Sequence, residues 1–161
     1  MRTRSWTLLL ALAWLAASPA RATADVTAFL GVSPTGATRS VRGLAAGAGL
    51  VVVGFEVEGT RIVQDEAAGA PALTTGLANV IVQTPLDVSR LRFYGTTGAG
   101  FYRETFGARQ ETSLATNIGG GVKIRVAGPL KLRLDYRLLR LRGAPVHDTY
   151  HRVYAGATLG F

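Results

Sequence analysis

Hydrophobic and polar residues alternate with a period of two over most of the chain after residue 25. The clearest case is the segment 130–137, where Leu or Tyr occupies every even position and Lys, Arg or Asp every odd position. The last segment, 153–161, places Val, Ala, Leu or Phe at every odd position. Because successive side chains of a strand point to opposite faces, this period predicts β-strands with one apolar and one polar face.

The pattern predicts eight strands and no long helix, since each interior glycine costs a helix about 1 kcal/mol and glycines recur throughout. The expected strands cover residues 26–33, 42–50, 52–63, 76–84, 90–102, 114–127, 130–142 and 151–161. Their connections alternate between short or modest ones (50–51, 84–89, 127–129) and longer polar ones (34–41, 64–75, 104–113, 143–150). The alternation shifts at Leu138–Leu139, which predicts a β-bulge there.

The first 24 residues differ from the rest. Two arginines lie within the first four positions, an uncharged run covers 6–17, and small residues end in A-x-A sequences at Ala22 and Ala24. This order is typical of a secretory signal peptide. The uncharged run would span roughly 18 Å as a helix, too short for the ~30 Å hydrocarbon core of a membrane. We therefore predict a cleaved leader of residues 1–24 and one domain of residues 25–161, with cleavage after Ala22 as the alternative.

Composition limits the remaining choices. Only 17% of the 161 residues are charged, against about a quarter in a typical soluble domain, and 48% are hydrophobic. These values exclude a disordered chain and a coiled coil, and the lack of cysteine excludes disulfides and thiolate sites. The formal net charge of +8 falls to +5 without the leader. We expect no nucleic-acid binding, because the basic residues alternate with apolar ones along strands rather than forming a stripe.

An eight-stranded barrel can be soluble, with its apolar face inward, or membrane-spanning, with that face toward lipid. Alternating short and long connections are typical of the membrane type. Each Arg or Lys facing lipid at mid-depth costs about 2–4 kcal/mol, whereas charges of both signs can pair inside a narrow barrel. We therefore predict an all-β fold, an eight-stranded antiparallel up-and-down transmembrane barrel. The polar residues expected in its lumen are Glu56, Glu58, Arg92, Lys123, Arg125, Lys131, Arg133, Asp135 and Arg137.

The end of the chain resembles the C-terminal signal of bacterial outer-membrane barrels, which the barrel assembly machinery reads. Phe161, Leu159 and Tyr154 carry this resemblance. The segment 117–137 also resembles the penultimate hairpin of small outer-membrane barrel domains. The resemblance implies an outer membrane protein A-like barrel without a periplasmic cell-wall-binding domain, located in the outer membrane of a Gram-negative-type bacterium.

Candidate chemistry is sparse. The only histidines, His147 and His151, have Asp148 as their one nearby carboxylate, and zinc usually takes three or four protein ligands. Lipid-modifying barrels of this membrane need a base, a nucleophile and an orienting carboxylate, for which His151, Ser113 and Glu104 or Glu111 are available. No strong motif surrounds them, so we expect no enzyme activity, no cofactor and no metal.

We therefore expect a monomer with a structural or surface-interaction role, namely membrane integrity, adhesion or loop-mediated binding. Outer-membrane lipid and lipopolysaccharide are the expected partners. Arg39, Arg42, Arg109 and Arg152 are the candidates for binding lipopolysaccharide phosphates. Side chains fill a barrel of eight strands, so a wide pore is not expected. A soluble periplasmic or secreted ligand-binding barrel, a lipid-modifying enzyme and a narrow ion channel remain alternatives.

Overall fold

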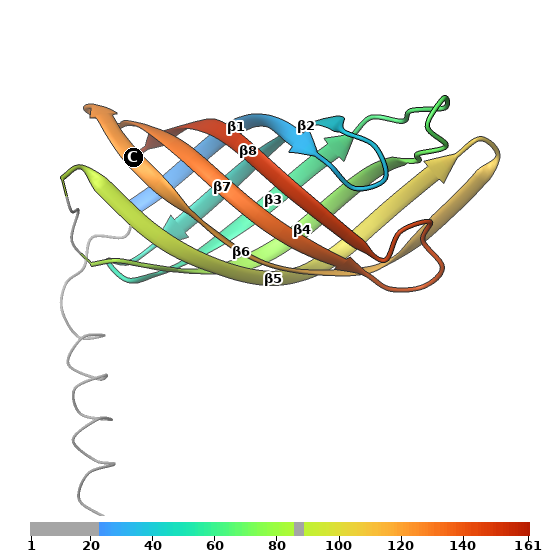
Figure 1. The fold of residues 1–161 in the computed structure, drawn as a ribbon. Helices are drawn as coiled ribbons and strands as arrows, with labels where there is room; N and C mark the ends of the chain where they lie inside the picture. The colour runs from blue at the N-terminus through green and yellow to red at the C-terminus, as the bar shows by residue number, and fades with distance from the viewer. Residues whose placement is uncertain (1–22, 86–88) are drawn as a thin grey trace, which may run out of the picture.

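The computed structural model describes residues 23–85 and 89–161. They form eight antiparallel strands, each paired with the next along the chain, and β8 pairs with β1 to close the barrel (Figure 1). The strands are β1 (Thr23–Ser33), β2 (Arg39–Gly49), β3 (Val53–Ile62), β4 (Ala72–Gln83), β5 (Leu91–Phe106), β6 (Arg109–Ala127), β7 (Leu130–Leu141) and β8 (Thr149–Gly160). The predicted eight-stranded up-and-down barrel is confirmed.

Residues 1–22 lie outside the described residues, so the cleaved leader stays a prediction. Its last two residues, Thr23 and Ala24, begin β1 and pair with Gly49 and Ala48 of β2. In the part of the chain that the structure describes, no helix combines the length and the apolar character needed to cross a bilayer.

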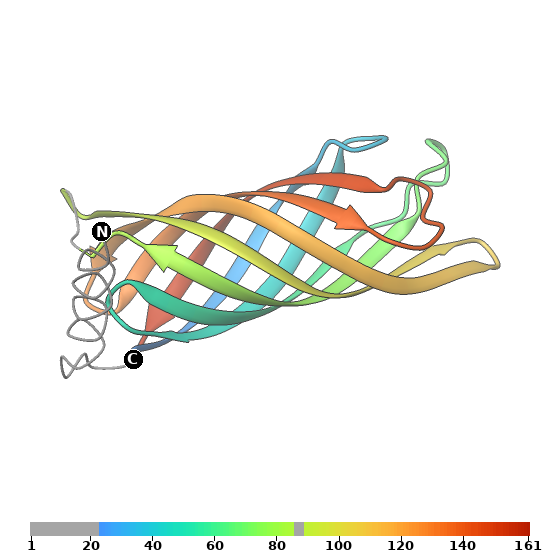
Figure 2. The ribbon, with the colours of Figure 1, turned by 90° about the horizontal axis from the view of Figure 1, so that it is seen from below.

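The two ends of the barrel differ in their connections (Figure 2). The C-terminus and the start of β1 lie at one end with the connections 50–52, 84–90 and 128–129; we call this the short-turn end. The connections 34–38, 63–71, 107–108 and 142–148 lie at the other, which we call the long-loop end.

The prediction of a long connection at 104–113 is wrong. The predicted strict alternation of short and long connections is therefore wrong as well. β5 and β6 continue through this segment and meet at a two-residue turn, Gly107-Ala108. Gly107 has φ +57°, the positive value that a type II′ hairpin turn requires at its first central residue. The hairpin projects beyond the other strands, so its polar residues need no apolar face and resemble a loop in the sequence (Figure 1).

The β-bulge predicted at Leu138–Leu139 is also wrong. β7 pairs there without interruption, Leu138 with Ile118 and Leu139 with Asn117, and Leu139 is buried inside the barrel. The apparent shift arises because the lumen changes from charged to apolar toward the long-loop end. The register shift lies in β6 instead, between Arg125 and Ala127.

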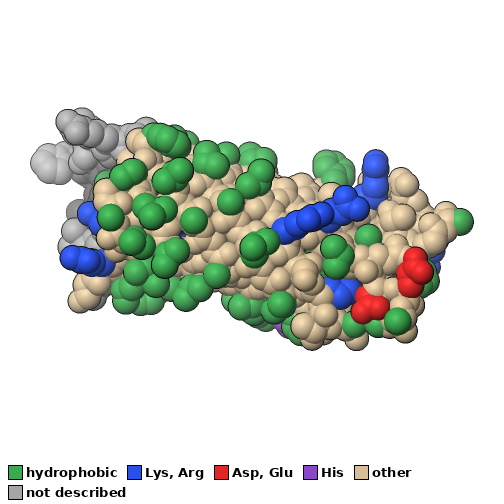
Figure 3. Space-filling view, turned by 90° about the horizontal axis from the view of Figure 1, so that it is seen from above, with side chains coloured by type: hydrophobic (Ala, Val, Ile, Leu, Met, Phe, Trp, Pro, Cys, Tyr) green, Lys and Arg blue, Asp and Glu red, His purple; other side chains and the backbone are tan. Residues whose placement is uncertain are grey.

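The barrel has its apolar face outward. Leu30 and Phe55 are 70% and 67% exposed, whereas Arg133 and Arg137 are at most 1% exposed. In the space-filling view, hydrophobic side chains are spread over the wall near the short-turn end, and most charged side chains lie toward the long-loop end (Figure 3). A soluble barrel has the opposite arrangement, so the wall is suited to lipid.

Candidate functional site

An ion network occupies the middle of the lumen. It consists of three acidic and three basic side chains, all less than 5% exposed: Glu56, Glu58, Asp135, Arg133, Arg137 and Arg152. The acidic residues come from β3 and β7 and the basic ones from β7 and β8. Their charges balance, which buried ions require because an unpaired charge in a low-dielectric interior is very costly.

Arg137 is the centre of this ion network. Its guanidinium lies 2.8 Å from Glu56 Oε1, 3.0 Å from Glu58 Oε2 and 3.2 Å from Asp135 Oδ1. Arg133 pairs with Glu56 and, at 2.8 Å, with Asp135. Arg152 pairs with Glu58 at 2.9 Å. These pairs connect β3 to β7 and β8 across the lumen.

Tyrosines complete the ion network. The Tyr154 hydroxyl donates to Glu58 Oε2 at 3.2 Å, and the Tyr94 hydroxyl donates to Asp135. Arg133 Nε in turn donates to the Tyr94 hydroxyl at 2.6 Å. These bonds use carboxylate lone pairs that the arginines leave open, which lowers the cost of burying the ions.

An apolar plug fills the lumen on the long-loop side of the ion network. Its members are Val41, Ile62, Leu73, Tyr102, Leu139, Leu141 and Tyr150, each at most 5% exposed. Beyond it, Glu104 accepts hydrogen bonds from the Val146 amide at 2.8 Å and from the Tyr150 hydroxyl at 3.3 Å, tying the last loop to the barrel. The lumen of the described barrel is therefore packed with side chains from the ion network to the long-loop end.

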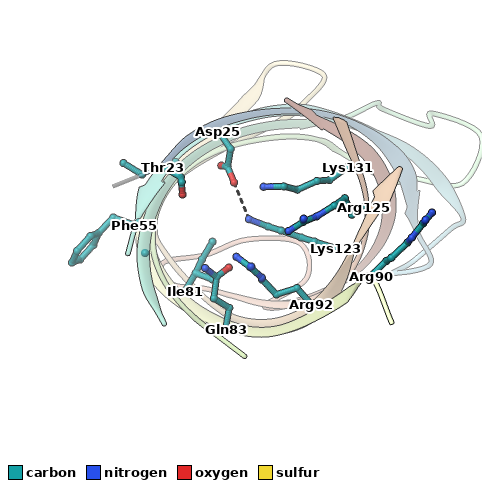
Figure 4. A pocket seen from close by; sticks show the side chains of 14 residues that line it. Thr23, Asp25, Phe55, Ile81, Gln83, Arg90, Arg92, Lys123, Arg125 and Lys131 are labelled. Carbon is teal, nitrogen blue, oxygen red and sulfur yellow. Dashed lines mark hydrogen bonds and ion pairs between the residues drawn. The ribbon is translucent and has the colours of Figure 1, made fainter. Parts of the chain in front are cut away.

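The residues predicted for the lumen are not all equally deep. Glu56, Glu58, Lys123, Arg133, Asp135 and Arg137 are buried. Arg92 and Lys131 are half-buried and Arg125 is exposed, all three at the mouth of the short-turn end (Figure 4). Arg152 is a lumen residue that sequence reasoning missed, although it shares the parity of Tyr154, on the polar face of its strand.

The predicted assembly residues lie on both faces of β8. Tyr154 points inward, is 2% exposed and stacks on Phe29 with ring centroids 4.2 Å apart. Leu159 and Phe161 point outward and are exposed. The role of these three residues in assembly stays a prediction.

The prediction of which arginines bind lipopolysaccharide needs correction. Arg39 is buried and donates to the carbonyl of Pro71, and Arg152 belongs to the ion network, so neither reaches a lipid phosphate. Arg109 is exposed and donates to the Ala144 carbonyl at 2.6 Å. Arg42 is exposed on the outer wall. Alternation assigns a residue to a face only when the strand boundary is right, and β2 begins at Arg39 rather than at the predicted residue 42.

Arg42 is part of a row that continues around the wall. It lies directly opposite Arg61, which lies opposite Thr74, which lies opposite Arg103, so one cross-strand row runs over β2, β3, β4 and β5. Because the strands of a barrel are tilted, this row runs obliquely around the wall. We call Arg42, Arg61 and Arg103 the arginine row. All three are exposed and form no ion pair with a described residue. In each of the three strands, the arginine follows the apolar outward-facing positions on the side of the long-loop end. This change from apolar to basic residues on one strand face is visible in the sequence.

A hollow of about 880 Å³ lies on the wall beside this row. Arg42, Arg61 and Thr74 line one part of it. Leu30, Leu44, Gly59, Leu132, Ala155 and Ala157 line the apolar part. The small residues among these leave the wall recessed, so the hollow combines cationic and apolar surface in one place.

The side chains considered for catalysis do not converge. His151 faces outward, where its Nδ1 lies 2.7 Å from the Tyr136 hydroxyl. In the sheet, His151 lies opposite Leu138 of β7, which in turn lies opposite Ile118 of β6. Ser113 lies five residues from Ile118 along β6, on the inward side of that strand. In residues 23–85 and 89–161, no group of three His, Asp or Glu side chains is placed to hold a metal ion.

Comparison with known proteins supports the fold. A scan against family models finds no match, and a sequence search of curated proteins finds none either. Solved structures do match. The N-terminal β-barrel domain of Pseudomonas aeruginosa OprF has a TM-score of 0.64 at 14% identity, covering 86% of this chain and 97% of that one. Neisserial surface protein A has a TM-score of 0.66 at 19% identity, with coverages of 87% and 96%.

A major outer membrane protein from Thermus thermophilus has a TM-score of 0.69 at 12% identity, covering 87% of this chain and 99% of that one. At sequence identities this low, the structural similarity supports the fold and says nothing about the activity. The closed barrel, the inverted burial and these three likenesses lead to one conclusion: the chain has the fold of small eight-stranded outer-membrane β-barrels.

Proposed function

We propose that this protein is a structural barrel of the outer membrane that binds lipopolysaccharide phosphates through the arginine row. The observation that carries the proposal is the placement of three exposed arginines in one cross-strand row of the outer wall, beside exposed apolar side chains such as Leu30 and Leu44. Outer-membrane barrels place their longer loops outside the cell. Arg42 and Arg61, three positions and one position from the long-loop ends of their strands, then lie on the outer-leaflet side of the wall.

The chemistry of the row fits a phosphorylated glycolipid. Guanidinium groups form short, often bidentate hydrogen bonds with phosphate, and these are stronger than neutral ones. Directly opposed residues on neighbouring strands lie about 4.5–5.5 Å apart, so Arg42 and Arg61 can hold one phosphate between them. The adjoining hollow, with Leu30 and Leu44, offers apolar surface to an acyl chain.

The packed lumen supports a structural role over transport. The ion network and the apolar plug together fill the barrel from its middle to the long-loop end. Membrane integrity is therefore the role we favour among those expected from the sequence, because it needs only the wall and its lipid contacts.

Replacing all three arginines of the row by glutamine tests this proposal. Loss of these charge-assisted bonds, each contributing about 1.5–3 kcal/mol, should weaken lipid A binding at least tenfold. Binding is measured by calorimetry on the refolded protein in non-ionic detergent. Arg140→Gln is the matched control, because Arg140 is exposed on β7 away from the row and should leave the affinity unchanged.

Dephosphorylated lipid A serves as the second control. The wild-type protein should bind it as weakly as the triple variant binds lipid A, because the phosphates supply the charge. Equal affinity of wild type and triple variant for lipid A would show that the row does not bind this lipid.

A further inference from the structure

The mouth of the barrel at the short-turn end gathers positive charge. Arg92 of β5, Lys123 and Arg125 of β6 and Lys131 of β7 extend into it from three consecutive strands (Figure 4). Asp25 of β1 lies across the mouth and pairs with Lys123 at 2.9 Å. This cluster lies at the opposite end of the barrel from the arginine row.

The cross-strand pairing of these cations is unfavourable on its own. Arg92 lies directly opposite Lys123, and Arg125 lies directly opposite Lys131. Like charges in directly opposed positions destabilise a sheet. Arg92 and Arg125 also interact with other parts of the chain, but two such pairs side by side still concentrate positive charge at one place.

Acidic residues do not balance this charge. Of the residues that line the mouth, Asp25 is the one acidic side chain that the structure describes. The sequence of the connection 84–90 adds one more acidic residue, Asp87. Even with both counted, the five cations that line the mouth, Arg90 included, leave an excess of three positive charges, whereas the ion network deeper in the lumen is balanced.

The mouth also has room for a ligand. It contains a cavity of about 40 Å³, where one water molecule needs roughly 10–15 Å³. Gly47, Gly49 and Gly54 form the wall opposite the cations. A Cβ at Gly47 would lie 2.9 Å from Asp25 Oδ1, so side chains there would narrow the space.

We propose that this mouth binds a phosphate group, with Lys123 and Lys131 as its principal ligands and Arg92 and Arg125 beside them. Phosphate accepts several charge-assisted hydrogen bonds at once and relieves the repulsion between the opposed cations. Two sources share this chemistry: a phospholipid headgroup of the adjoining leaflet, and free phosphate or a soluble phosphate ester. Asp25 competes with the ligand for Lys123.

Calorimetry on the full barrel, refolded in non-ionic detergent, tests this inference with two probes. Inorganic phosphate represents the free source, and a short-chain phosphatidic acid below its micelle concentration represents the headgroup. Lys131→Gln should weaken binding about tenfold, in line with loss of one charge-assisted bond. Asp25→Asn should strengthen it, because Lys123 is released to the ligand, and a general folding defect would not produce a gain. Arg140→Gln, which removes one positive charge at a distance, should change nothing.

Binding of either probe with this order of affinities supports the site, and the probe that binds more tightly identifies the source. Absence of binding in both arms, or equal affinities for wild type, Lys131→Gln and Asp25→Asn, would overturn it. The triple glutamine variant of the arginine row should retain full binding at the mouth, so failure of one proposal can be told from failure of the other.

Discussion

Replacing Arg137 by methionine is expected to lower the free energy of unfolding by about 3–5 kcal/mol, the usual effect of removing one partner from a buried ion pair. Arg137 lies within 3.2 Å of Glu56, Glu58 and Asp135, so its loss leaves three carboxylates with only Arg133 and Arg152. Methionine retains most of the volume, which separates the loss of charge from the creation of a cavity. Urea unfolding in detergent micelles, followed by far-ultraviolet circular dichroism, measures the change.

Two further variants sharpen this test. Arg140→Met removes an arginine from the same strand but from the exposed face, and should not lower stability. Adding Glu58→Gln to Arg137→Met restores the charge balance and should recover part of the loss. If Arg137→Met and Arg140→Met unfold at the same urea concentration, the ion network does not stabilise the barrel.

Replacing Gly121 by valine is expected to cost about 1–3 kcal/mol or more, the range for overpacking a close-packed interior. A Cβ at Gly121 would overlap the carbonyl oxygen of Leu134 and lie 2.6 Å from the Tyr94 hydroxyl. β6 and β7 would have to separate at the level of Asp135, beside the ion network. The yield of folded barrel on refolding into detergent should fall accordingly.

Gly76→Val is the matched control for this substitution. Gly76 also lies within a strand, β4, but nothing lies within 4 Å of the position of its Cβ, and valine is favoured in strands. This variant should refold as well as the wild type. Equal yields for the two variants would contradict the close packing described for Gly121.

Much of the architecture can be read from the sequence because a strand has a period of two. The alternation in 130–137 assigns each side chain to the lumen or the wall, and the structure places Arg133, Asp135 and Arg137 inside. The partners of these residues cannot be predicted in this way. Glu56 meets Arg133 across 77 positions of sequence, and only the closure of the barrel and the register of every intervening strand bring them together.

Depth along the barrel axis is the second quantity that the period does not supply. Alternation assigns Lys131, Arg137 and Leu139 to strand faces but not to levels, so it does not separate the cationic mouth, the ion network and the apolar plug. An apolar residue such as Leu139 on the inward face therefore interrupts the alternation in the sequence in the same way that a β-bulge would. The arginine row cannot be read from the pattern for a related reason, since it forms only when the strand register places Arg42 beside Arg61 and leaves Arg103 one strand further on, beyond Thr74.

The central property proposed for this protein is a closed barrel whose apolar wall faces lipid. Fractionation of cells expressing the full chain, followed by electrophoresis of each fraction with and without heating in detergent, tests this directly. We predict that the protein is recovered with outer membranes and that its unheated form migrates differently from its heated form, because a closed barrel resists unfolding at room temperature. Recovery in the soluble periplasmic fraction, with one mobility under both conditions, would contradict the account.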